Sequence, residues 1–142
     1  MSAVSRIALI KPGDPLPERE FKPDNVQLFL YNAALWNAHR IHFDYPYATE
    51  VEGYPGLVIA GPLLGDWLTQ CVIEWLGSDG ELKSIEYSNR KAAYIGETLR
   101  SGGKVLSLER ESGSVELELY IKNEADEVIT PGVAVVSFPA TQ

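Results

Sequence analysis

The clearest regularity in the chain is a strict alternation of apolar and polar residues over residues 115–122. Valine, leucine and isoleucine fill the odd positions, whereas glutamate, tyrosine and lysine fill the even ones. A period of two predicts a strand with one buried face and one wet face. Further strands are predicted over residues 82–94, 99–110 and 128–138. Asn89-Arg90 would bend the first of these, and Pro131, which cannot donate to a ladder, predicts an edge or a bulge in the last.

A helical period replaces the alternation over residues 62–76. Apolar side chains there recur at the i, i+3, i+4 spacing of one face, and others, including Ile73, lie on the remaining faces. Pro62 suits a first helical position because its missing N–H would have no partner there, and Gly77 supplies the stop. The spacing predicts a helix about 22 Å long that is buried on most sides.

The N-terminal part of the chain has a weaker pattern. Four prolines predict an extended, irregular lead-in over residues 1–25. A short strand is predicted over residues 26–30, and Asp44 can cap a short helix over residues 45–51. A sheet curled around a central helix accommodates this order of one short strand, one long helix and four antiparallel strands. Such a sheet has exposed edges, which a dimer joined edge to edge would cover.

Composition excludes several classes of protein. A length of 142 residues suits a single domain, residues 1–142, and a hydrophobic content of 45% permits a substantial core. The net charge of −8 argues against a nucleic-acid or anionic-membrane partner, because both need clustered cations. Cys71 stands alone in an apolar run, which predicts a buried, inert thiol. Neither a signal peptide nor a membrane span is indicated, so we expect a cytoplasmic protein.

The candidate chemistry lies in two short segments. The only two histidines of the chain, His39 and His42, occur in Asn37-Ala38-His39-Arg40-Ile41-His42. Histidine is the usual proton carrier because its ordinary pKa lies nearest neutrality. About twenty residues later, Gly53-Tyr54-Pro55-Gly56-Leu57-Val58-Ile59-Ala60-Gly61-Pro62 leads directly into the predicted central helix.

This layout resembles the hot-dog fold, and the motifs resemble the MaoC-like hydratases and dehydratases. That group adds water to 2-enoyl thioesters and removes it from (R)-3-hydroxyacyl thioesters. The segment from Asn37 to His42 is most similar to the catalytic segment of fungal-type mitochondrial 3-hydroxyacyl dehydratases and mesaconyl-CoA hydratases. In the broader family this segment is Asp-x-Asn-Pro-x-His, so its aspartate falls on Asn37 and its histidine on His42. The family's His-Gly before the helix falls on Ala60-Gly61, which lacks the histidine.

The resemblance implies an α+β hot-dog fold and a hydro-lyase. His42 would be the general base, Asn37 would hold the attacking water, and the Gly61 N–H would face the thioester oxygen. Further substrate contacts are expected from His39, Arg40, Tyr54 and Ala60. No metal or cofactor is implied, since coenzyme A or acyl carrier protein would be part of the acyl-thioester substrate. The partner would be a second hot-dog chain, in a homodimer or a heterodimer.

Other interpretations remain open. His42 could be a structural histidine that donates to a backbone carbonyl, and Asn37 could be a turn residue that satisfies its own backbone. A hot-dog thioesterase would use a carboxylate on the central helix, where Asp66 and Glu74 are available. The chain could also be the non-catalytic subunit of a hetero-oligomer, although His42 then favours its being the catalytic half.

Overall fold

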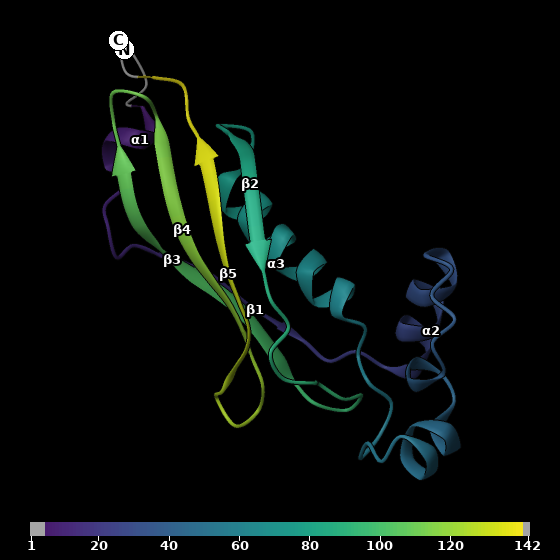
Figure 1. Ribbon diagram of the computed structural model, residues 1–142. Coiled ribbons are helices and arrows are strands. Elements are labelled where there is room, and N and C mark those ends of the chain that lie inside the picture. Colours follow the sequence, from purple (N-terminus) through teal and green to yellow (C-terminus); the bar gives the residue numbers. More distant parts are fainter. Residues whose placement is uncertain (1–4, 141–142) are drawn as a thin grey trace.

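The computed structural model describes residues 5–140, and Figure 1 shows a curved antiparallel sheet with one long helix lying against it. The helical elements are α1 (Arg6–Leu9), α2 (Asn25–Ala34), η1 (Arg40–His42), η2 (Tyr47–Val51) and α3 (Gly61–Leu76). The strands are β1 (Pro15–Phe21), β2 (Glu81–Tyr87), β3 (Leu99–Glu109), β4 (Ser114–Lys122) and β5 (Val128–Ser137). Their order across the sheet is β1-β3-β4-β5-β2, with every neighbouring pair antiparallel. This confirms the expected architecture.

The core lies between the sheet and α3, as the two periodicities predict. Along β4 the odd, apolar positions 115–121 are all buried, and α3 contacts each of the five strands. The buried side chains of the helix include Leu64, Trp67, Leu68, Cys71 and Val72. Burial raises the pKa of the Cys71 thiol, consistent with an inert role.

The bounds of the central helix are predicted within one residue, but fewer of its faces are buried than expected. It begins at Gly61, and Gly77 ends it with a positive φ of 61°. The face turned away from the sheet is open, and Ile73 on that face is 52% exposed. The expectation of burial on most sides is therefore wrong for this face, because a single curved sheet covers only one side of a helix.

Two expectations for the N-terminal region are wrong. The lead-in contains α1 and β1, and β1 pairs with β3 as an edge strand, where prolines are tolerated. Residues 1–4 of that lead-in lie outside the described residues. The short strand expected over residues 26–30 is instead part of α2. Asp24 caps α2, since its carboxylate accepts from the Gln27 N–H at 2.8 Å.

The remaining differences concern chain ends and turns. The strand predicted over residues 82–94 ends at Tyr87, and Tyr94 forms only an isolated bridge with Val58. Strand β5 lies inside the sheet, so Pro131 does not mark an edge. The ladder does shift register beside it, between β4 and residues 128–130 of β5. The helical turns over residues 45–51 are confirmed, with Asp44 accepting from the Tyr47 N–H at 3.2 Å.

A short extended segment, residues 57–60, places both candidate motifs. Its Ile59 N–H donates to the Ala93 carbonyl at 2.9 Å, and its Val58 N–H donates to the Ile41 carbonyl at 3.0 Å. The segment therefore joins the histidine motif to the start of α3. In Figure 1, α2 and the turns that follow it lie beyond the N-terminal end of α3.

Candidate active site

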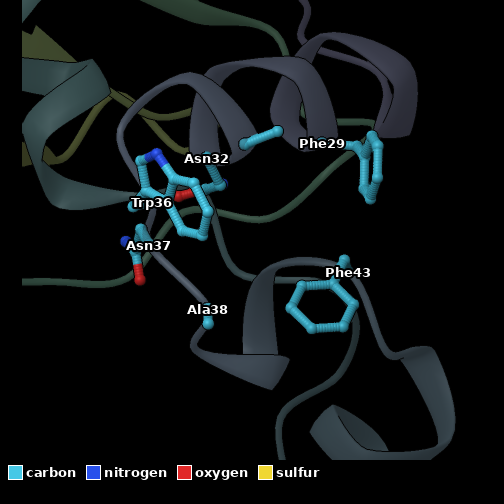
Figure 2. A pocket seen from close by; sticks show the side chains of 7 residues that line it. Phe29, Asn32, Trp36, Asn37, Ala38 and Phe43 are labelled. Carbon is cyan, nitrogen blue, oxygen red and sulfur yellow. The ribbon is translucent and has the colours of Figure 1, made fainter.

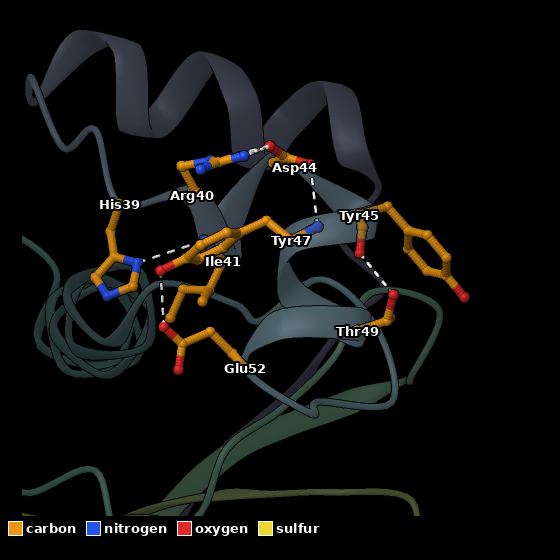
Figure 3. Close-up of polar contacts among 8 residues, drawn as sticks. All are labelled: His39, Arg40, Ile41, Asp44, Tyr45, Tyr47, Thr49 and Glu52. Atoms are coloured by element: carbon orange, nitrogen blue, oxygen red, sulfur yellow. Dashed lines mark hydrogen bonds and ion pairs between the residues drawn. The ribbon is translucent and has the colours of Figure 1, made fainter.

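The histidine motif is built from two successive self-capping turns. The Asn37 side-chain Oδ1 accepts from the His39 N–H at 3.2 Å, and the His39 ring Nδ1 accepts from the Ile41 N–H at 3.4 Å. Figure 3 shows the second of these contacts. The interpretation of Asn37 as a turn residue is thus correct. Its carboxamide Nδ2 is not used by the turn, so a donor remains for a ligand.

The motif places the imidazole of His42 in a buried position, with one ring nitrogen already in a hydrogen bond. His42 is 7% exposed, and its Nδ1 lies 2.6 Å from the Val58 carbonyl oxygen. A carbonyl oxygen can only accept, so Nδ1 carries the proton and Nε2 holds the lone pair. No residue in the described range hydrogen-bonds to Nε2. His42 therefore makes the bond of a structural histidine and still presents a basic nitrogen.

The surroundings of His42 favour the neutral form of its ring. Burial is the main cause of a lowered pKa for His42; the nearby His39 lowers that pKa further, and the bond to Val58 opposes the shift. The rings of the two histidines meet edge to face, with centroids 5.8 Å apart. A general base must be unprotonated before the reaction, and this environment meets that requirement.

Arg40 is held by its own neighbours. Its Nε and Nη2 donate to the same Asp44 carboxylate oxygen at 3.0 and 2.8 Å, and its guanidinium lies over the Tyr47 ring (Figure 3). The bond from Arg40 is the main cause of a lowered pKa for the Asp44 carboxyl. The local charge of Arg40 is balanced, and its contact with substrate stays a prediction.

The start of α3 presents one free backbone donor. Pro62 has no N–H, and the N–H groups of Leu63 and Leu64 both donate to the Ala60 carbonyl. Among the described residues, no acceptor meets the Gly61 N–H, which sits at the positive end of the helix dipole. The Val58 carbonyl that holds His42 is three residues away. At roughly 3.5 Å per residue, the His42 ring and the Gly61 N–H are within roughly 13 Å of each other.

Asn37 also borders an apolar pocket of about 350 Å³ (Figure 2). The side chains that line it are Phe29, Asn32, Ala33, Trp36, Asn37, Ala38 and Phe43. Pockets for small ligands commonly begin at about 300 Å³ and are mostly apolar. Neither His42 nor Gly61 lines this pocket, so the structure brings Asn37 to it but does not place the three candidate groups around one cavity.

Tyr54 and Ala60, the remaining predicted substrate contacts, are held in the fold by a backbone hydrogen bond and by burial. The Tyr54 N–H donates to the Ala48 carbonyl at 2.9 Å, and Ala60 is fully buried. Of the carboxylates a thioesterase would use, Asp66 accepts from the Tyr31 hydroxyl at 2.7 Å and Glu74 pairs with Arg19 at 3.2 Å. The substrate contacts proposed for Tyr54 and Ala60 stay predictions.

One residue at the start of α3 was not among the predicted site residues. The Asn89 carboxamide packs against Gly61, and its Oδ1 accepts from the Thr130 hydroxyl at 3.0 Å. In the sequence, Asn89 is notable only as a polar residue at a predicted bend. Within residues 5–140, no group of three or more His, Cys, Asp or Glu side chains could hold a metal ion, and no helix could span a membrane.

The fold is shared with known hydratases. The structure superimposes on the R-hydratase PhaJ1 of Pseudomonas aeruginosa with a TM-score of 0.85 and 18% identity, covering 95% of this chain and 86% of that one. The class defined by this architecture is the hot-dog fold. A narrower assignment comes from sequence, because the profile of hydroxyacyl-thioester dehydratase type 2 matches residues 5–95. The chain belongs to the hydroxyacyl-thioester dehydratase type 2 family.

Two curated relatives agree with this assignment. The mesaconyl-C(4)-CoA hydratase of Chloroflexus aurantiacus is 44% identical over 68 residues, which cover 38% of this chain and 24% of that protein. The mitochondrial hydroxyacyl-thioester dehydratase type 2 of Schizosaccharomyces pombe is 34% identical over 85 residues, covering 56% and 27%. The chain thus spans about a quarter of the length of these relatives.

Proposed function

We propose that the chain catalyses the hydration of 2-enoyl thioesters and its reverse, the dehydration of (R)-3-hydroxyacyl thioesters. The observation that carries the proposal is His42, a buried, neutral imidazole whose Nδ1 is fixed on the Val58 carbonyl and whose Nε2 is free. The names of the relatives, a hydratase and a dehydratase of acyl thioesters, support the same chemistry. The thioester carrier would be coenzyme A or acyl carrier protein.

In hydration, Nε2 of His42 takes a proton from water as the water oxygen bonds to C3 of the acyl group. The electron pair of the C2=C3 bond moves toward the thioester oxygen, where the Gly61 N–H stabilises the developing charge. Asn37 donates from Nδ2 to the water and orients it without accepting its proton. C2 then takes a proton, and the thioester carbonyl re-forms.

His42 has to perform both proton transfers in this scheme. Asn37 occupies the position of the carboxylate in the broader family, and an amide does not exchange protons at neutral pH. The proton that Nε2 removes from water therefore returns to C2 from the same nitrogen. Because both new bonds are served by one imidazole, water and proton would be added to the same face of the alkene.

The apolar pocket beside Asn37 supplies a place for the acyl chain. Its wall includes Phe29, Trp36 and Phe43, and its volume of about 350 Å³ suits a short to medium chain. We also infer pairing with a second hot-dog chain, in a homodimer or a heterodimer. Strands β1 and β2 are the outer strands of the sheet, and Trp36 at the pocket rim is 94% exposed.

The test is a hydration assay with crotonyl-CoA and longer enoyl-CoAs, followed by loss of enoyl absorbance, with thiol release measured in parallel. We expect His42→Ala to lower the hydration rate by about 10²–10⁴-fold, the usual contribution of a general base. Glu111→Ala is the control, because it removes an exposed side chain from the turn between β3 and β4. Thiol release without hydration would favour a thioesterase, and activity only after a second chain is added would favour the partner-subunit hypothesis.

A further inference from the structure

Asn89 lies just beyond β2, at the start of the loop that leaves the sheet. The backbone on both sides of it is tied to β5: the Ser88 N–H donates to the Pro131 carbonyl at 3.1 Å, and the Arg90 N–H donates to the Ile129 carbonyl at 2.9 Å. Its side-chain Oδ1 accepts from the hydroxyl of Thr130, which is fully buried. Asn89 is therefore held at three points by one interior strand.

These bonds determine which end of the carboxamide faces α3. Because Oδ1 is occupied by Thr130, Nδ2 points the other way, toward Gly61. A Cβ added to Gly61 would collide with Nδ2 and would stand 3.3 Å from Cγ of Asn89. Glycine is thus required at position 61 for the approach of the Asn89 side chain.

The contact places Nδ2 at the open end of the helix. Nδ2 occupies the position that a Cβ of Gly61 would take, and Cα–Cβ bonds tilt toward the helix N-terminus, so Nδ2 lies beside the first turn, which carries the Gly61 N–H. Among the described residues, Nδ2 has no hydrogen-bond acceptor. Asn89 is also exposed, so a ligand at the start of α3 can reach it.

We propose that Asn89 Nδ2 and the Gly61 N–H together bind the thioester oxygen of the substrate. The inference rests on the proposed hydratase function and adds a catalytic residue that the sequence motifs do not indicate. As the C3–O bond forms, charge accumulates on the thioester oxygen, and both donors bind it more strongly than they bind the ground-state carbonyl. A donor that is fixed in advance, as Thr130 fixes Asn89, needs no rearrangement during the reaction.

The main test is Asn89→Asp, which keeps the shape and the acceptor for Thr130 but replaces the donor with a negative charge. Loss of one such donor typically lowers kcat by about 10²–10³-fold, and we expect at least that for Asn89→Asp. KM should change little, because the bond strengthens in the transition state. Asn89→Ala should lower kcat by a similar factor and tests the donor without introducing a charge. Melting temperatures of both variants provide the control for folding.

Thr130→Val tests how Asn89 is held. It leaves the donor in place but frees the carboxamide to rotate, so we expect a smaller loss of kcat than in Asn89→Ala. Adding Thr130→Val to Asn89→Ala should lower kcat almost no further. Binding of a thioether analogue of the substrate, which lacks the carbonyl oxygen, should be unchanged in all these variants.

The outcomes distinguish the role of Asn89 from the proposed hydratase function on which it rests. A wild-type chain that hydrates enoyl-CoA while Asn89→Asp and Asn89→Ala retain its kcat would overturn the role of Asn89 and leave the hydratase intact. A wild-type chain without hydration would overturn both. A loss of melting temperature that accounts for the loss of kcat in each Asn89 variant would assign Asn89 a structural role instead.

Discussion

At the scale of single residues, the candidate site depends on which atom of each side chain is already in use. The Oδ1 atom of Asn37 accepts from the His39 N–H, and its Nδ2 is left for a ligand. The Nδ1 atom of His42 donates to the Val58 carbonyl, and its Nε2 is left as a base. Each bond fixes the orientation of a polar group without consuming its functional end. A structural role and a chemical role are therefore compatible at both residues, although the sequence presented them as alternatives.

Asn37→Asp isolates the part played by the amide. A carboxylate at this position can still accept from the His39 N–H, so the turn should persist and stability should change little. We expect the hydration rate to be retained or raised, by at most the roughly 10²–10⁴-fold that a second general base supplies. Steady-state rates with crotonyl-CoA provide the measurement.

The companion variant Asn37→Ala removes both the turn bond and the donor, and its rate should fall. If Asn37→Asp instead abolished hydration while keeping its melting temperature, Nδ2 would be essential as a donor. The expectation that a carboxylate can take the place of the amide at position 37 would then be wrong.

At the scale of elements, strongly periodic segments were predictable, whereas α2 and β1, which show no clear period, were not. Strand β4 and helix α3 follow periods of 2 and 3.6 because each buries a single face. Helix α2 was mistaken for a strand, because its exposed apolar side chains obscure the period. The signal that could have identified it is Asp24 followed three residues later by Gln27, a typical helix start. Strand β1 was missed because prolines argue against strands in general but are tolerated at an edge.

The cap of α2 gives a prediction at this scale. Asp24→Ala removes the acceptor of the Gln27 N–H, and loss of such a cap costs about 1 kcal/mol of stability. Since α2 contributes Phe29, Asn32 and Ala33 to the apolar pocket, we also expect a higher KM for acyl chains that fill it. Thermal unfolding and KM across chain lengths measure the two effects.

Glu111→Ala is a suitable control for Asp24→Ala, because it removes an exposed carboxylate from the turn between β3 and β4. Equal melting temperatures for the two variants would show that the cap does not stabilise α2.

At the scale of the whole molecule, four of the five strands and the central helix followed from the sequence, whereas β1 and the approach of the histidine motif to α3 did not. The segment over residues 57–60 holds the histidine motif near the start of α3 through the bonds of Val58 to Ile41 and His42, and it pairs with residues 93–95. This pairing joins short, irregular segments that carry no period of their own. The approach of Asn89 to Gly61 likewise depends on β2 and β5 being neighbours, a feature of topology that local pattern does not contain.

Global stability should depend on pH through His42. Its pKa in the folded chain lies below the ordinary value of 6.5, mainly because of burial, so below pH 6.5 the unfolded chain binds more protons than the folded one. The contribution of His42 to stability is therefore complete above pH 6.5 and is lost as the pH falls from 6.5 toward the folded pKa. The carboxyl pKa values of Asp44, Glu81 and Glu127 are also lowered, from ordinary values of 3.8 for aspartate and 4.5 for glutamate. These carboxylates therefore change stability at lower pH than His42 does.

Urea unfolding at pH 7.5, 6.5 and 5.5 separates His42 from these carboxylates. The fall in unfolding free energy between pH 6.5 and 5.5 should shrink in His42→Asn, whose amide can still donate to the Val58 carbonyl but does not titrate. Most of the fall should persist in His39→Asn, because burial, rather than the neighbouring His39, is the main cause of the lowered pKa of His42. An unchanged slope in His42→Asn would show that burial does not lower the pKa of the His42 ring.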